Sequence, residues 1–179
     1  LVSEYKGIVA SELGRDFPQD VHEQLWGAIG AVFGTDVSAV GAYLQRLAEA
    51  CAPFSLRVES PWILGSQSAQ IAAFAEIRKF LANHQCPVGI VADEWVNSTA
   101  DVEKFLVNKA VDWVHIKMPN LGGLQHSVDA VLACHAAGVG SLLGGSCIET
   151  DLSTKSSVHV GLATQARCFL VKPGMRSEE

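Results

Sequence analysis

Short apolar runs alternate with longer amphipathic segments along most of the chain. Six of these runs predict strands, over 21–25, 56–59, 88–92, 113–117, 141–143 and 168–171. Strands that alternate with helices in this way are typical of a parallel sheet built from crossover βα units. The runs carry few charges, as expected for parallel strands that are buried on both faces. The pattern fits two architectures, a doubly wound open sheet and a (β/α) barrel.

Five amphipathic helices are expected between the strands, over 37–51, 71–81, 98–106, 124–132 and 152–163. Thr35 or Asp36 could cap the first of them, because both side chains can accept a hydrogen bond from a free N–H of the first turn. Ser98, followed three residues later by Asp101, could cap the third. Gly138 stands where a left-handed residue commonly ends a helix, after the fourth.

Composition limits the classes of protein that this chain can belong to. The 179 residues are 49% apolar and 18% charged, which predicts one folded domain with a substantial core. A net charge of −6 argues against nucleic acid or an anionic membrane as the main partner. No apolar run is long enough to span a membrane, and no signal peptide is expected. Five scattered cysteines without a Cys-x-x-Cys pair indicate a reduced, cytoplasmic protein.

Polar residues at the ends of the predicted strands give the first indication of a site. Glu59, Asp93, Lys117 and Cys147 follow successive strands at intervals of 34, 24 and 30 residues, each about one βα unit. In a (β/α) barrel such positions meet at one mouth, where catalysis occurs. The same residues could instead be ordinary solvated charges in loops.

These residue types suggest a metal-assisted proton abstraction. Two carboxylates on adjacent strands, Glu59 and Asp93, can hold a hard cation such as Mg²⁺. Lys117 on the next strand can act as a base, and the metal would stabilise the enolate formed when a carbon next to a carboxylate loses a proton. His115 lies two residues before Lys117 and should share its inward face. His22 could also face the mouth of the barrel. Lys117 could instead form an ion pair with a purely structural role.

Four segments resemble one known family, the methylaspartate ammonia-lyases of the enolase superfamily. They are Val-Ala-Asp-Glu-Trp at 91–95, Ile-Lys-Met-Pro-Asn-Leu-Gly-Gly at 116–123, Gly-Gly-Ser-Cys-Ile-Glu-Thr at 144–150 and Lys-Pro-Gly-Met at 172–175. The resemblance runs from about residue 26 to 175 and covers only the C-terminal part of the family's barrel. It implies a parallel (β/α) barrel that is incomplete, with about six of eight strands. Residues 1–179 would then form a single C-terminal barrel domain, without the family's N-terminal capping domain.

The resemblance also implies an activity and roles for three residues. The family removes ammonia from L-threo-3-methylaspartate to give mesaconate, with Mg²⁺ as cofactor, in amino-acid catabolism. Its metal is held by three carboxylates on consecutive strands, of which Glu59 matches the second and Asp93 the third. Lys117 matches the base that takes the C3 proton.

Five further positions carry over, two of them with a departure. Ser146 and Cys147 match the pair that lines the substrate, and Leu170 matches an apolar substrate contact. His115 stands in place of a glutamine that binds a substrate carboxylate. Gln24 occupies the place of the first metal carboxylate, so weaker metal binding is expected because an amide oxygen carries no charge.

Three readings of function therefore remain open. The first is a Mg²⁺-dependent carbon–nitrogen lyase acting on a small amino-acid or dicarboxylate substrate. The second keeps the same enolisation but leads to a dehydratase or epimerase reaction. The third is a truncated, non-catalytic remnant that binds a small acid or a partner chain. Six strands would leave two open sheet edges, so we expect either a homodimer or a complementing chain that supplies the missing strands.

Overall fold

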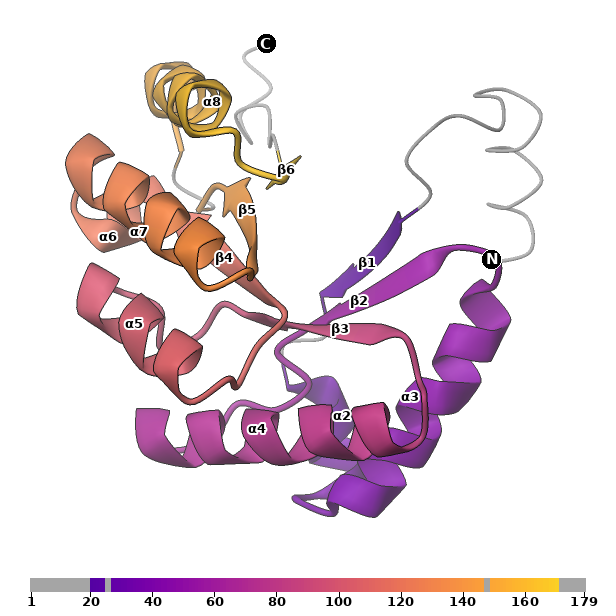
Figure 1. Cartoon of the computed structure of the whole chain (residues 1–179). Helices are drawn as coiled ribbons and strands as arrows, with labels where there is room; N and C mark the ends of the chain where they lie inside the picture. The colour runs from indigo at the N-terminus through magenta and orange to yellow at the C-terminus, as the bar shows by residue number, and fades with distance from the viewer. Residues whose placement is uncertain (1–19, 25–26, 147–148, 171–179) are drawn as a thin grey trace, which may run out of the picture.

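The computed structural model describes residues 20–24, 27–146 and 149–170, and these form one curled parallel sheet with helices on its outer side (Figure 1). The sheet order is β1-β2-β3-β4-β5-β6, the order of the sequence. A doubly wound sheet would reverse its strand order, whereas consecutive order carries every crossover to the same face. The expectation of an incomplete (β/α) barrel is therefore confirmed. The strands are β1 (Asp20–Gln24), β2 (Ser55–Glu59), β3 (Val88–Ala92), β4 (Trp113–Lys117), β5 (Gly140–Gly144) and β6 (Cys168–Phe169).

Seven helices lie in the described part of the chain: α2 (Ala28–Phe33), α3 (Val37–Cys51), α4 (Gln67–Asn83), α5 (Thr99–Val107), α6 (Met118–Leu121), α7 (Leu124–Ala136) and α8 (Asp151–Thr164). The five expected helices correspond to α3, α4, α5, α7 and α8. The short helices α2 and α6 were not predicted. None of the described helices has the length and apolar character needed to cross a membrane.

The local signals at the helix ends have the expected geometry. Asp36, not Thr35, caps α3, and its carboxylate accepts hydrogen bonds from the N–H groups of the first turn. Ser98 caps α5 by accepting from the N–H of Asp101. Gly138 follows α7 with a φ of 69°, a left-handed conformation that glycine adopts without steric cost.

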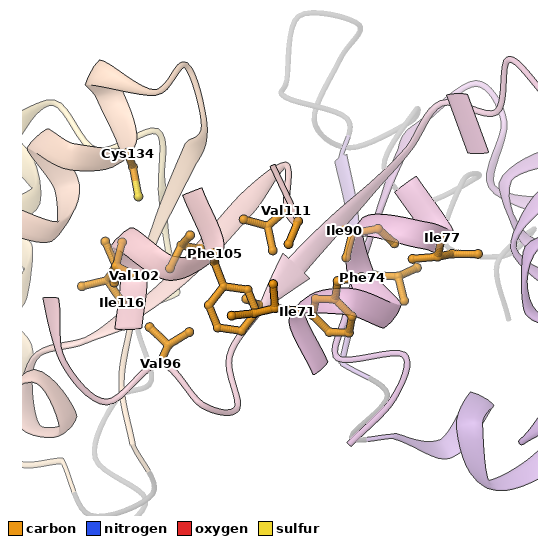
Figure 2. Close-up of a cluster of buried hydrophobic side chains, with 14 of the residues drawn as sticks. Ile71, Phe74, Ile77, Ile90, Val96, Val102, Phe105, Val111, Ile116 and Cys134 are labelled. Atoms are coloured by element: carbon orange, nitrogen blue, oxygen red, sulfur yellow. The ribbon is translucent and has the colours of Figure 1, made fainter. Parts of the chain in front are cut away.

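One face of the sheet is apolar and packs against the helices. Because successive residues of a strand point to opposite faces, alternate positions of the inner strands form this layer. Its buried strand residues are Leu56, Val58, Val88, Ile90, Ala92, Val114, Ile116 and Leu143. Figure 2 shows Ile90 and Ile116 among helix residues such as Phe74 and Phe105, whose ring centroids lie 6.2 Å apart. This layer fixes which residues of each strand face the other way.

The other face of the sheet is the inner wall of the curled sheet and carries polar side chains. Near the amino ends of the strands, the Arg57 guanidinium lies 4.3 Å from the ring centroid of Trp113. Gly140 leaves room for this indole, because a Cβ at position 140 would collide with it. Two residues further along the same strands, Glu59 and His115 occupy the next layer.

The curled sheet has two edges among the described residues. β1 pairs with β2, and β6 pairs with β5, while no other pairing of β1 or β6 occurs within 20–24, 27–146 and 149–170.

Candidate active site

Four of the polar side chains singled out in the sequence converge at the carboxyl ends of three neighbouring strands. Glu59 ends β2, Asp93 follows β3, and His115 and Lys117 belong to β4. All four have the parity of the inner face, because β2, β3 and β4 are in register. Glu59 is 0% exposed, His115 is 1% exposed and Asp93 is 9% exposed. The strand-end residues that the sequence singled out therefore meet in a largely desolvated cluster.

The polar groups form a continuous chain of contacts across four strands. His22 of β1 places Nε2 2.8 Å from Glu59 Oε2. The same carboxylate oxygen lies 3.1 Å from His115 Nδ1, which in turn lies 3.8 Å from Asp93 Oδ1. Lys117 Nζ donates a hydrogen bond of 2.6 Å to Asp93 Oδ2. Each buried carboxylate thus has a lysine or a histidine as its hydrogen-bond partner, as the burial of a charged group requires.

The two histidines keep Glu59 ionised. Burial by itself would raise the pKa of Glu59, but hydrogen bonds from His115 and His22 and the charge attraction of both imidazoles outweigh it. The pKa of Glu59 consequently lies well below the usual range of a glutamate. An ionised carboxylate in a buried position is the form that binds a metal cation.

The donor set fits a divalent cation. Glu59, Asp93 and His115 each offer one ligand atom, and these three atoms lie within 4.8 Å of one another. Two carboxylate oxygens supply the negative charge that Mg²⁺ and related ions require. Lys117, which is 18% exposed, stands beside this group on the side of Asp93. The arrangement can therefore hold a cation and present an amine next to it.

The loops after β2 and β3 are tied to each other close to the two carboxylates. Ser60, which directly follows Glu59, has a φ of 48° and is fully buried. Its N–H donates to the carbonyl of Val91 at 3.1 Å, and its carbonyl accepts from the N–H of Gly27 at 2.8 Å. Its hydroxyl donates to the carboxylate of Glu94. Ser60 therefore links the ends of three strands and fixes the separation of Glu59 and Asp93.

Two glutamines of α4 hold these loops from outside. The side chain of Gln70 accepts from the N–H of Leu64 at 2.8 Å and donates to the carbonyl of Trp62 at 2.6 Å. Gln67 donates to the carbonyl of Trp95 at 3.0 Å. The loops that follow the site carboxylates are thus anchored by side-chain hydrogen bonds on the helix that connects them.

Of the remaining predicted site residues, the structure describes some fully, one only through its backbone and one not at all. Ser146 is half-buried just beyond β5. Leu170 follows β6, and its N–H donates to the carbonyl of Leu143 at 2.8 Å. Gln24 pairs in register with Glu59 through its backbone. The side chain of Gln24 and the whole of Cys147 lie outside the described part of the structure.

Two residues of the site were missed by sequence reasoning. Ser60 was not singled out, because its role depends on a left-handed backbone that no local pattern predicted. Gly144 was noted only as part of a Gly-Gly pair. A Cβ at position 144 would collide with Nε2 of His115, so this glycine makes room for the buried imidazole. A glycine at a strand end, opposite a bulky inward residue of the neighbouring strand, is the signal that could have identified it.

Comparison with known proteins finds one family and several relatives that this chain resembles in sequence and structure. Residues 4–179 match the family described as "Methylaspartate ammonia-lyase C-terminus". The chain is 42% identical over 166 residues to methylaspartate ammonia-lyase 2 of Carboxydothermus hydrogenoformans, covering 93% of this chain and 40% of that relative. The chain therefore spans about two fifths of the length of this relative.

Two solved structures extend the match to three dimensions. One is the magnesium complex of β-methylaspartase from Clostridium tetanomorphum, with a TM-score of 0.90 and 38% identity. The other is the Citrobacter amalonaticus methylaspartate ammonia-lyase containing (2S,3S)-3-methylaspartic acid, with a TM-score of 0.91 and 33% identity. Each match covers 97% of this chain and 42% of the other.

Proposed function

This chain belongs to the methylaspartate ammonia-lyase family, and we propose that it supplies the metal-binding and proton-abstracting part of a carbon–nitrogen lyase. The substrate is L-threo-3-methylaspartate, and the products are mesaconate and ammonia. One observation carries the proposal: Lys117 Nζ lies 2.6 Å from a carboxylate of the candidate metal site. A base and a cation site in contact are what enolisation of a carboxylate substrate requires.

Glu59 and Asp93 are the proposed metal ligands, with His115 beside them. Their donor chemistry suits a divalent cation, and the Clostridium tetanomorphum relative is a magnesium complex. When bound there, the cation supplies positive charge that stabilises the substrate carboxylate as it gains electron density. Gln24 is proposed to line the same site, in register with Glu59.

Lys117 is the proposed base. Its amine takes the proton from C3, and the electron pair of the broken C–H bond moves into the adjacent carboxylate as an enolate. As the enolate collapses, that pair forms the C2–C3 double bond while the C2–N bond breaks, and the nitrogen leaves with the electron pair of that bond as ammonia. Lys117 ends β4 and its amine lies 2.6 Å from Asp93, the residue that directly follows β3, so a substrate carboxylate bound at the cation would have the amine beside it.

Three residues are proposed to contact the substrate. Ser146 and Cys147 come after β5 in the sequence, and Leu170 comes after β6. A hydroxyl, a thiol and an isobutyl group offer one polar and two less polar surfaces. This combination suits a small branched amino acid such as the one in the Citrobacter amalonaticus relative.

The activity can be tested by the growth of mesaconate absorbance with methylaspartate and Mg²⁺. The protein should be assayed together with the region that precedes this part in its longer relatives. We expect turnover in the wild type and a loss of at least about a hundredfold in Lys117→Met, since removal of a general base costs roughly 10²–10⁴ in rate. Lys104→Met, which removes a surface ion pair with Asp101, is the control and should retain full activity. No turnover in the wild-type assembly would reject the proposal, and turnover with a hydroxy acid instead would favour a dehydratase.

The two sheet edges support a proposal about partners. β1 and β6 each pair on one side among the described residues, and open edges are normally covered in native proteins. We expect further strands, from the same polypeptide or from a complementing chain, to pair with these edges. Sedimentation of the chain alone and mixed with the preceding region tests this expectation. We expect tight, stoichiometric association, whereas a stable monomer that does not bind the preceding region would contradict it.

A further inference from the structure

We infer that His115 is a metal ligand through Nδ1 and that this site therefore prefers a first-row transition-metal ion, represented by Mn²⁺, over Mg²⁺. The inference rests on the proposed function, because it concerns the same cation site. It gives His115 a role different from the substrate contact implied by the family resemblance.

The position of Nδ1 supports ligation. It lies 3.1 Å from Glu59 Oε2 and 3.8 Å from Asp93 Oδ1. Two ligands that share one ion lie roughly 3.0–3.5 Å apart when each metal–ligand bond is about 2.0–2.2 Å. All three ligand atoms lie within 4.8 Å of one another. Small side-chain adjustments would place one ion in contact with both carboxylates and the imidazole.

The packing of the ring decides which nitrogen can bind. Nε2 lies on the side of Gly144, where even a Cβ would collide with it. It has no hydrogen-bond partner among the described residues. His115 is 1% exposed, so the surrounding side chains hold the ring in this orientation. Nδ1 is therefore the nitrogen that faces the two carboxylates.

The second histidine has a different position. His22 Nε2 lies 2.8 Å from Glu59 Oε2, and its side chain is 20% exposed. It is not part of the group of three ligand atoms within 4.8 Å of one another. His22 is thus placed to orient the Glu59 carboxylate, as groups around metal ligands commonly do.

A nitrogen ligand changes which ion the site favours. Mg²⁺ prefers oxygen ligands and gives up its water reluctantly. Imidazole binds first-row transition-metal ions well. Their affinities for sites with nitrogen and oxygen ligands generally rise from Mn²⁺ to Cu²⁺. The described ligand atoms of this site are two carboxylate oxygens, of Glu59 and Asp93, and one imidazole nitrogen, of His115. That set favours Mn²⁺ and later ions relative to Mg²⁺.

Calorimetric titration with Mg²⁺ and with Mn²⁺ tests the preference directly. We expect wild type to bind Mn²⁺ at least about tenfold more tightly than Mg²⁺, and His115→Gln to lower that ratio by about fivefold or more. Asp93→Ala should weaken both ions. His159→Gln changes an exposed histidine of α8 and should leave the ratio unchanged. A ratio unaffected by His115→Gln would overturn the inference.

Pulsed electron paramagnetic resonance of the Mn²⁺ complex tests the bond itself. Modulation from a directly coordinated ¹⁴N is expected in wild type and in His22→Gln, and should vanish in His115→Gln. Modulation that survives in His115→Gln but vanishes in His22→Gln would assign the nitrogen to His22 and overturn the inference. A wild type that binds neither ion would reject the metal site of the proposed function as well. A wild type that binds Mn²⁺ without nitrogen modulation would reject only the role of His115.

Discussion

Lys117 Nζ, at the end of β4, lies 2.6 Å from Oδ2 of Asp93, the residue that directly follows the neighbouring strand β3. The Lys117 ammonium is thus hydrogen-bonded to the Asp93 carboxylate, which we propose as a metal ligand. Charge-assisted hydrogen bonds of this length are among the stronger contacts in proteins. A cation that binds Asp93 must share or replace this interaction, which couples metal binding to the release of the base.

Removal of the ammonium should therefore strengthen metal binding. We expect Lys117→Met to bind Mg²⁺ roughly tenfold more tightly, since a hydrogen bond to a charged group contributes about 1.5 kcal/mol or more. Calorimetric titration measures the change. Lys104→Met removes a longer and more exposed ion pair, with Asp101 at 3.2 Å on the same helix α5, and should not change the affinity. Equal or weaker binding in Lys117→Met would show that the amine does not compete with the cation.

Acid should destabilise the fold through Glu59. Its pKa in the folded protein lies below the value of about 4.3 expected in the unfolded chain. A depressed pKa means that the unfolded state takes up the proton more readily, so this contribution to stability is present above that value. It is lost as the pH falls from about 5 toward the folded-state pKa. Urea titrations between pH 7 and pH 3 should show the free energy of unfolding declining over this range.

A matched pair of variants isolates this contribution. Glu59→Gln cannot ionise, so its free energy of unfolding should decline less between pH 5 and pH 3 than that of wild type. Glu103→Gln, at an exposed position of α5, should follow the wild-type curve. Parallel curves for Glu59→Gln and wild type would mean that Glu59 is not held ionised by His115 and His22.

The link between Ser60 and Glu94 should matter for metal affinity. Ser60→Ala removes the hydroxyl that donates to Glu94 and loosens the ends of β2 and β3. We expect the affinity for Mg²⁺ to fall by roughly tenfold, as for other residues that orient metal ligands. Ser38→Ala, on the exposed first turn of α3, is the control. An affinity unchanged by Ser60→Ala would leave the hydroxyl with a purely local role.

The apolar layer between sheet and helices should dominate stability. Phe105 of α5 is fully buried beside Phe74, and its replacement by alanine should cost about 3–5 kcal/mol in the free energy of unfolding. Leu162 of α8 is 68% exposed, and Leu162→Ala should stay within about 0.5 kcal/mol of wild type. Urea unfolding followed by circular dichroism compares the two. Similar losses in both variants would contradict the assignment of the core.

The sequence predicted the regular elements well where local and tertiary preferences agree. Strands β3 and β4 have the expected bounds, because their β-branched runs are bordered by turn residues and buried on both faces. Helix α6 was missed because it spans only Met118–Leu121 and contains a proline. Helix α2 was missed because it spans only Ala28–Phe33 and contains a glycine, a poor helix former. Helices of four to six residues depend on the chain around them more than on their own propensity.

The candidate site was predicted in part. The spacing of Glu59, Asp93 and Lys117 by one βα unit was enough to expect them at one mouth, and the structure brings them together. The contact between Nδ1 of His115 and the two carboxylates could not be predicted, because it depends on a ring orientation set by Gly144. The alternation of side chains along a strand predicts which face of the sheet a residue lies on, but not which residue it contacts there.

The exchange of the C3 hydrogen of 3-methylaspartate with solvent tests the central claim most directly. Nuclear magnetic resonance in D₂O would follow the loss of that signal with Mg²⁺ and the protein assembled with its preceding region. We predict exchange or elimination in wild type and in Lys104→Met, and neither in Lys117→Met. Loss of the C3 hydrogen at the wild-type rate in Lys117→Met would contradict the assignment of Lys117 as the base.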